Sequence, residues 1–245
     1  MSSLLYTRFE LLRTIRNRRF FILSFGFPLV IYLLVAGSVQ HIHDIDHTGL
    51  SGPLYFMIGW ATFGTMNSMV ACGARIAAER QAGWTRQLRI SPLSSRAYFV
   101  TKIGTSYMMA LITLVVLYLA GSSYGVSLSV GGWLGMTGLI LIGLIPLAAL
   151  GVLLGHLFTP DSIGPAMGGG VALLGLLGGT FFPLTGHGFL PEFAQYLPSR
   201  WLVQASHVGV GGSGWPLKGW IVIVAWTAVL SVLAARAYKR DTGRV

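Results

Sequence analysis

Charged residues are scarce in this sequence, and their scarcity excludes most soluble folds. Only 10% of the 245 residues are Asp, Glu, Lys or Arg, whereas 53% are hydrophobic. A typical soluble domain is about 25% charged. The mean hydropathy of +0.69 agrees with this contrast. The composition therefore predicts an all-α, multi-pass membrane protein whose length is used up by spans and short loops, with no room for a soluble catalytic domain.

Motifs for disulfide and nucleotide chemistry are also lacking. The single cysteine, Cys72, excludes an intrachain disulfide framework. No G-x-x-x-x-G-K-[ST] loop occurs, and the run at 168–170 has no lysine after it. We therefore predict no catalytic residue, no metal site and no cofactor of the chain's own.

The basic residues that are present indicate topology rather than nucleic-acid binding. The net charge is +10, but the charges sit at the ends of apolar runs instead of forming a stripe on a folded surface. Five Lys or Arg precede residue 20, six lie between residues 75 and 102, and four lie in the tail after residue 235. The other side of the predicted membrane has Arg200 and Lys218. The positive-inside rule then places both termini in the cytoplasm of a protein of the cell membrane.

The apolar runs predict six spans within a single domain that covers residues 1–245. The predicted spans are 20–39, 54–78, 103–121, 130–155, 164–182 and 219–235. Residues 183–216 are expected outside the cell, as a re-entrant segment with short helices.

The first nineteen residues, 1–19, are expected to form an amphipathic helix in the cytoplasmic interface, although a purely topogenic basic leader explains them equally well. As a helix, this segment places leucines and Phe9 on one face and Thr7, Glu10, Arg13 and Thr14 on the other.

Histidines offer a different class of function, a metal-binding protein or a six-span membrane enzyme. The first outer loop contains His41, His43, Asp44, Asp46 and His47, and further histidines at 156, 187 and 207 lie near span ends. Imidazole and carboxylate can together bind zinc or copper. Spacing alone is a weak motif, however, so a solvated polar loop and interfacial histidines are the favoured interpretations.

Glycines and polar side chains within the spans give two further hypotheses. Gly164, Gly168, Gly175 and Gly179 leave one face of the fifth span bare, which allows close packing of helices within the chain or between two chains. A lining for an amphiphilic cargo is assigned to six residues: Thr62, Met66, Asn67, Tyr107, Phe181 and Phe182. For any single one of these six residues, ordinary core packing is the favoured interpretation.

A polar segment at 79–102 separates the second and third predicted spans and contains five of the 17 Lys and Arg residues. Its pattern contains Glu79, Arg80, Gly83, Trp84, Arg86, Arg89, Ser91 and Pro92. This pattern resembles the cytoplasmic loop of the ABC-2 membrane family, the permeases of type-2 ABC exporters. A second stretch, 178–184 followed by Leu190-Pro191, Leu197-Pro198 and Trp201, resembles that family's fifth-span end and re-entrant segment. Trp84 departs from the small or polar residue expected there.

The resemblance implies a permease subunit that is not an enzyme by itself. It implies a second permease copy, identical or paralogous, and two ATPase subunits that bind ATP and Mg. Membrane lipids complete the expected partners, and nucleic acid is not among them. Residues 79–98 would form a cytoplasmic coupling helix whose eight motif residues dock the ATPase, with Trp84 as an apolar anchor. The expected function is export of hydrophobic or amphiphilic compounds such as drugs or antibiotics, and export of lipid or polysaccharide is the alternative.

Overall fold

The computed structural model describes residues 3–16, 22–83, 94–186 and 188–242, and these residues form helices and no strands. The elements are α1 (Ser3–Arg16), the π-helical turn η1 (Ile22–Gly26), α3 (Phe27–Val39), α4 (Gly52–Val70), α5 (Cys72–Gln81), α7 (Ser95–Ser123), α8 (Val130–Gly143), α9 (Ile145–Leu157), α10 (Pro160–Gly178), α11 (Phe189–Ala194), α12 (Pro198–Gln204), α13 (Ser206–Gly209) and α14 (Leu217–Thr242). The all-α prediction is confirmed for this part of the chain.

Several predicted boundaries differ from the observed ones, each for a local reason. The predicted second span is two helices, α4 and α5, separated at Ala71. The predicted fourth span divides at Leu144, next to Pro146. Helix α7 begins eight residues before the predicted third span, because the Ser94 side chain accepts a hydrogen bond from the Ala97 N–H and caps the helix.

The fifth predicted span is displaced toward the N-terminus. A Thr159 capping box starts α10 at Pro160, and Gly179 in the left-handed conformation ends it after Gly178. Phe181 and Phe182 therefore follow the helix instead of lying within it. The sixth predicted span, 219–235, is part of a longer helix, because α14 begins at Leu217 and continues to Thr242.

Three long helices are apolar enough to cross a bilayer by length and composition. They cover Ser95–Ser123, Val130–Leu157 and Leu217–Asp241, and a shorter apolar helix covers Ser24–Val39. This apolar character supports a membrane protein, while the count of six spans stays a prediction. Large hydrophobic side chains are exposed along α7 and α14, including Val115, Leu119, Ile221 and Val224, as expected of surfaces that face lipid.

Helix α4 lies at the centre of the bundle. Fifteen of its 19 residues are buried, and it packs against α3, α7, α9, α10 and α12. Glycine permits the closest approach in the adjoining helix α5, where a Cβ on Gly73 would overlap the backbone of Gly151 and Gly155 in α9. Surrounded by other helices, α4 does not need the continuous apolar surface of a lipid-facing span.

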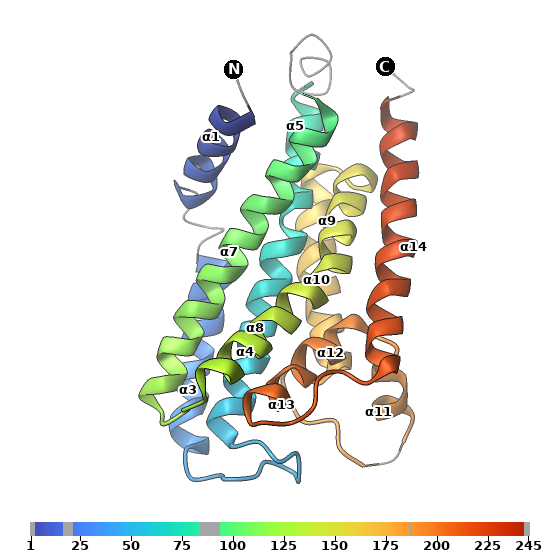
Figure 1. The fold of residues 1–245 in the computed structure, drawn as a ribbon. Helices are drawn as coiled ribbons and strands as arrows, with labels where there is room; N and C mark the ends of the chain where they lie inside the picture. Colours follow the sequence, from blue (N-terminus) through green and yellow to red (C-terminus); the bar gives the residue numbers. More distant parts are fainter. Residues whose placement is uncertain (1–2, 17–21, 84–93, 187, 243–245) are drawn as a thin grey trace.

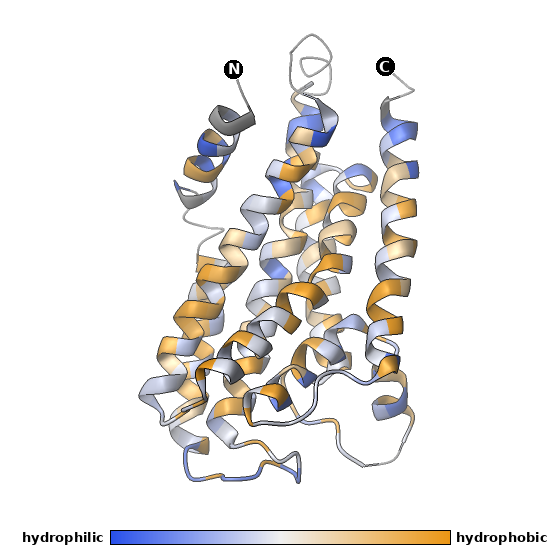
Figure 2. Ribbon diagram, in the orientation of Figure 1, coloured by the Kyte–Doolittle hydropathy of each residue, from blue (hydrophilic) through white to orange (hydrophobic). Residues whose placement is uncertain are grey.

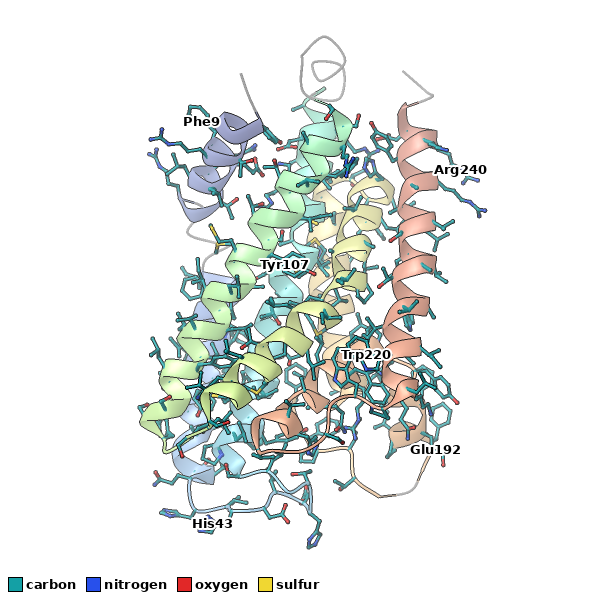
Figure 3. The ribbon with its side chains drawn as sticks, viewed as in Figure 1. Phe9, His43, Tyr107, Glu192, Trp220 and Arg240 are labelled. Atoms are coloured by element: carbon teal, nitrogen blue, oxygen red, sulfur yellow. The ribbon has the colours of Figure 1, made fainter. Side chains whose placement is uncertain are left out.

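Both chain termini lie at one end of the bundle, which we call the terminal end (Figure 1). The loop after α3 and the short helices α11 and α13 lie at the opposite end. Apolar residues dominate the middle of the helices, and hydrophilic residues gather toward both ends (Figure 2). Figure 3 places Arg240 at the terminal end, and it places His43 of the loop after α3 and Glu192 of α11 at the opposite end. Termini on the same side are what the predicted topology requires.

Candidate functional site

A buried lysine joins three helices at the terminal end. Lys102, on α7, is fully buried, and its Nζ donates to Glu10 Oε1 at 2.6 Å and to Glu79 Oε1 at 2.5 Å. Glu10 belongs to α1 and Glu79 to the last turn of α5. Tyr98 completes the contact by donating its hydroxyl to Glu79 Oε2 at 2.6 Å. One ammonium is thus shared by two carboxylates in a buried position, and the remaining negative charge is left for neighbouring cations.

Two arginines extend this cluster. Arg75 Nη1 donates to Thr14 Oγ1 at 2.6 Å, and its Nη2 donates to Ser106 Oγ at 2.8 Å. Arg13, at the exposed edge, donates to Glu79 Oε1 at 3.1 Å. We call the set Glu10, Arg13, Arg75, Glu79 and Lys102 the lysine cluster. Its contacts fasten α1 to α5 and α7.

The lysine cluster also explains the orientation of α1. The polar residues Glu10 and Thr14 are buried against the bundle, while Phe9 is 63% exposed and Leu12 46% exposed. The face that the sequence assigns to solvent therefore packs against protein, and the apolar face points outward. An outward apolar face suits the lipid interface expected for residues 1–19.

A second ionic contact joins α5, α9 and α14. Arg80 Nε and Nη2 donate to the two carboxylate oxygens of Asp241 at 2.5 and 2.7 Å, a bidentate pair. Arg80 Nη1 also donates to the Gly155 carbonyl at 2.8 Å. His156 Nδ1 lies 3.2 Å from Asp241 Oδ2. We call Arg80, His156 and Asp241 the arginine clamp.

The predicted docking residues divide into two groups. Glu79 and Arg80 are both engaged inside the chain, in the lysine cluster and the arginine clamp. Gly83 has a left-handed backbone with φ of +72° and open space around its Cα, so it turns the chain out of α5. Trp84, Arg86, Arg89, Ser91 and Pro92 lie outside the described residues. The described parts of the predicted coupling region 79–98 do not form one helix, because α5 ends at Gln81 and α7 begins at Ser95. The contacts assign Glu79 and Arg80 to anchoring the start of this loop.

One stripe of α4 is less buried than the rest of the helix. It consists of Phe56, Trp60, Phe63 and Asn67, spaced as one helical face. The ring of Phe181, just after α10, lies 5.2 Å from the Trp60 ring and 5.4 Å from the Phe63 ring. Phe27 of α3 approaches the same two rings at 6.0 and 6.3 Å. We call Phe27, Phe56, Trp60, Phe63, Asn67 and Phe181 the aromatic stripe.

The predicted cargo lining is only partly brought together. Asn67 and Phe181 belong to the aromatic stripe, whereas Thr62 and Met66 are fully buried in the core. Tyr107 donates to the Leu141 carbonyl of α8 at 3.0 Å, and Phe182 is 40% exposed next to Phe181.

The Asn67 side-chain amide donates to the Phe63 carbonyl of its own helix at 3.1 Å. This hydrogen bond does not link α4 to another helix. Sequence reasoning missed Phe27, Trp60 and Phe63. The helical spacing of Trp60, Phe63 and Asn67 was the available signal.

The four glycines predicted to form a bare face of the fifth span fall into two pairs with different surroundings. A Cβ on Gly175 would meet the Phe181 ring, and one on Gly179 would meet Arg200 and Leu184, so these two pack within the chain. Gly164 and Gly168 have no heavy atom within 4 Å of that position, nor have Gly169 and Gly170. The N-terminal two thirds of α10 therefore presents a bare, exposed glycine face.

The histidines of the alternative hypotheses are not gathered into a centre. Among the described residues, no three His, Cys, Asp or Glu side chains are placed to hold one metal ion. Asp44 instead accepts a hydrogen bond from the Gly49 N–H at 2.8 Å within its own loop. His156 belongs to the arginine clamp and His207 lies at the opposite end, while His187 is outside the described residues.

Comparison with known proteins agrees with this arrangement. A family model described as "ABC-2 family transporter protein" matches residues 48–236. The chain is 24% identical over 229 residues to a Bacillus subtilis (strain 168) protein named "Putative transport permease YvfS", and the alignment covers 92% of each protein. The family match includes α4, the aromatic residues after α10 and the loop 84–93.

Proposed function

This chain belongs to the ABC-2 family of transporter proteins, and on that premise we propose that it is the transmembrane subunit of an ATP-driven exporter. In this proposal a separate ATPase chain supplies the energy, because this sequence has no nucleotide-binding loop. The cargo is a hydrophobic or amphiphilic compound. Two permease copies and two ATPase subunits make up the complex, with the terminal end in the cytoplasm.

The anchored loop supports coupling to an ATPase. Residues 84–93 follow α5 directly, and Glu79 and Arg80 tie that helix to α1, α7, α9 and α14 through the lysine cluster and the arginine clamp. A force on the loop is therefore carried by ion pairs to four other helices rather than absorbed at the end of α5. In this role Trp84 and Arg86 bind the ATPase, and Glu79 and Arg80 hold the base of the lever.

The aromatic stripe is the observation that carries the cargo assignment. Its rings come from three segments of the chain and meet on the one partly exposed face of the central helix. The rings meet at tilted or edge-to-face angles of 50° to 81°. A partly exposed aromatic surface of this kind suits an apolar or amphiphilic compound better than a strongly hydrated one.

The exposed glycine face of α10 supports a second permease copy. A Cβ on Gly164 or Gly168 would have no heavy atom of the described residues within 4 Å, and a bare helix face permits close approach of another helix in lipid. A pair of chains joined near α10 would also enclose the aromatic stripe, since Phe181 directly follows that helix.

Co-purification and ATPase measurements test the proposal. The chain is co-expressed with a candidate ABC-type ATPase of the same genome, chosen by its Walker A sequence, and the proteins are purified and reconstituted in lipid vesicles. We expect the ATPase to co-purify, and we expect Trp84→Ala or Arg86→Glu to lower cargo-stimulated ATP hydrolysis at least about tenfold, as for an interface hot spot. Arg240→Glu is the matched control, because this exposed arginine at the same end points away from the bundle.

The same vesicles distinguish the cargo classes. Transport of a fluorescent amphiphilic dye is compared with that of a fluorescent phospholipid, in wild type and in Trp60→Ala. Dye transport that Trp60→Ala abolishes supports the proposal. Transport of phospholipid alone would assign the chain to lipid export, and a chain that never associates with an ABC-type ATPase would refute the proposed function.

A further inference from the structure

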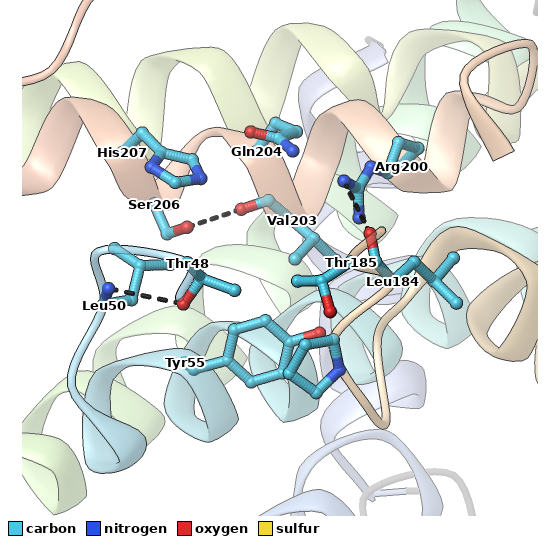
Figure 4. Close-up of a pocket in the computed structure, with 11 residues that line it drawn as sticks. Thr48, Leu50, Tyr55, Leu184, Thr185, Arg200, Val203, Gln204, Ser206 and His207 are labelled. Carbon is cyan, nitrogen blue, oxygen red and sulfur yellow. Dashed lines mark hydrogen bonds between the residues drawn. The ribbon is translucent and has the colours of Figure 1, made fainter. Parts of the chain in front are cut away.

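A polar pocket with a cationic wall lies at the opposite end of the molecule, away from both ionic contacts. It encloses about 280 Å³, counting space that is open to solvent. Its lining is Thr48, Leu50, Tyr55, Pro183, Leu184, Thr185, Arg200, Val203, Gln204, Ser206 and His207. Figure 4 shows the helical segment with Arg200, Gln204 and His207 on one side, and Thr48, Tyr55 and Thr185 on the other.

The cationic wall belongs to α12 and α13. Arg200, Gln204 and His207 are four and three residues apart, so they share one helical face. The residues between them, Trp201 to Val203, are buried in the bundle, and this burial fixes the direction in which that face points.

Arg200 is poorly satisfied by the protein. Its single hydrogen bond among the described residues runs from Nη2 to the Leu184 carbonyl and is long, at 3.5 Å. No carboxylate of the described chain lies within 4.0 Å of it, although all seven Asp and Glu residues are described. A guanidinium has five N–H donors in a planar fork, so most of this fork is left without a protein acceptor.

A structural role explains only the position of Arg200. The guanidinium lies beside Gly179, at the C-terminus of α10, where a cation is favourable. Helix-end carbonyls do not fill its fork, however, because its one hydrogen bond among the described residues goes to the Leu184 carbonyl. Burial lowers the pKa of Arg200, and burial together with the nearby Arg200 charge lowers the pKa of His207.

We propose that this pocket binds an oxyanion, with Arg200 as its bidentate ligand. A phosphate group matches the planar guanidinium fork, which makes two parallel hydrogen bonds to such a group. The Thr185 hydroxyl and the Gln204 amide line the same pocket and can each donate one more. This inference goes beyond transport and does not rest on it. Two sources present the same chemistry at this end of the molecule: the headgroup of a membrane phospholipid, and a free phosphate-bearing solute.

Thermal unfolding of the purified full-length chain in maltoside detergent tests the proposal. Inorganic phosphate and dihexanoyl phosphatidylglycerol are titrated separately at constant ionic strength, with chloride and hexyl maltoside as the phosphate-free counterparts. A ligand of the folded state raises the unfolding temperature with a concentration dependence that gives its Kd. We expect a rise with phosphate-bearing ligand in wild type, and binding at least about tenfold weaker in Arg200→Gln, since hydrogen bonds to charged groups contribute about 1.5–3 kcal/mol.

Lys218→Gln is the matched control. Lys218 is the other cation expected on the outer side of the membrane. Its Nζ donates to Gln195 and lies outside the pocket, so the affinity for the phosphate-bearing ligands should be unchanged. Arg200→Lys keeps the charge but loses the fork, and it provides a second variant if Arg200→Gln does not fold.

The outcomes separate the two sources. A rise with both ligands supports an oxyanion site open to free solutes, and a rise with the phosphatidylglycerol alone assigns the site to a lipid headgroup. The proposal is overturned if neither ligand raises the unfolding temperature, or if Arg200→Gln and Arg200→Lys bind as tightly as wild type. Neither result depends on an ATPase or on cargo, so failure here leaves the proposed function untouched.

Discussion

The two ends of this molecule treat buried charge in opposite ways. At the terminal end, Lys102 is fully buried and bonded to two carboxylates, and Arg80 is held bidentately by Asp241. At the opposite end, Arg200 has no carboxylate and one long hydrogen bond. The difference indicates that the charges at the terminal end hold helices together, whereas the charge at the opposite end is available to bind something else.

Close backbone packing, by contrast, occurs toward both ends. Near the opposite end, the Tyr55 hydroxyl donates to the Gly179 carbonyl, and a Cβ on Gly59 would collide with the Thr180 carbonyl. Nearer the terminal end, a Cβ on Gly73 of α5 would collide with the Gly151 carbonyl of α9. The two ends therefore differ in their ion pairs and not in their need for glycine.

The largest expected effect is that of Lys102→Met. Removal of the ammonium leaves Glu10 and Glu79 buried without their shared partner, which costs about 3–5 kcal/mol of folding stability. The matched change at the other end, Arg200→Met, should cost less than about 1 kcal/mol in phosphate-free buffer, because that cation has no ion pair to lose. Unfolding in detergent, followed by tryptophan fluorescence, measures both.

Equal losses in these two variants would contradict the comparison. A second check is the double variant Lys102→Met with Glu10→Gln. Because it removes one of the stranded carboxylates, it should recover part of the stability that Lys102→Met loses.

A smaller effect is expected for Gly59→Ala. The added methyl group would overlap the Thr180 carbonyl, and overpacking of this kind costs about 1–3 kcal/mol. Gly104→Ala is the control, since a Cβ there has no heavy atom within 4 Å and alanine also favours the helix. If the two alanine variants unfold at the same temperature, the opposite end does not depend on close backbone contact.

The smallest effect concerns pH. Burial and the charge of Arg200 lower the pKa of His207 below its usual value of 6.5. The unfolded chain therefore binds a proton before the folded chain does, so this residue's contribution is complete above pH 6.5 and is lost as the pH falls below it. His207→Gln should reduce the loss of stability between pH 7 and pH 5 by about 1 kcal/mol or less. An unchanged pH profile would show that His207 titrates normally.

The fold follows from the sequence where its determinants are local. Apolar runs located the long helices, and the serine and threonine caps at 94, 129 and 159 could have refined their starts. Glu10 and Lys102 are 92 residues apart in the sequence, so no local pattern indicates that their side chains meet. The sequence assigned Glu10 to a polar surface face, because periodicity shows which residues share a face and not what that face packs against.

The candidate site was predictable only in part. The sequence selects Asn67 and Phe181 by residue type and position, whereas Trp60 and Phe63 become candidates only because the packing of α4 leaves them on its one partly exposed face. Arg200 enters the sequence analysis only as a charge on the outer side, because its lack of a carboxylate partner is a property of three-dimensional neighbours.

The arginine clamp has a practical consequence for protein production. Asp241 lies close to the C-terminal end of the described chain, and it holds Arg80 at the base of the loop 84–93. An affinity tag or fluorescent protein fused after Thr242 leaves this carboxylate in place. A truncation before Asp241, or proteolytic trimming during purification, would release Arg80 from its carboxylate while every predicted span stays intact. Under the proposed function, we expect such a preparation to remain folded and to lose cargo-stimulated ATP hydrolysis.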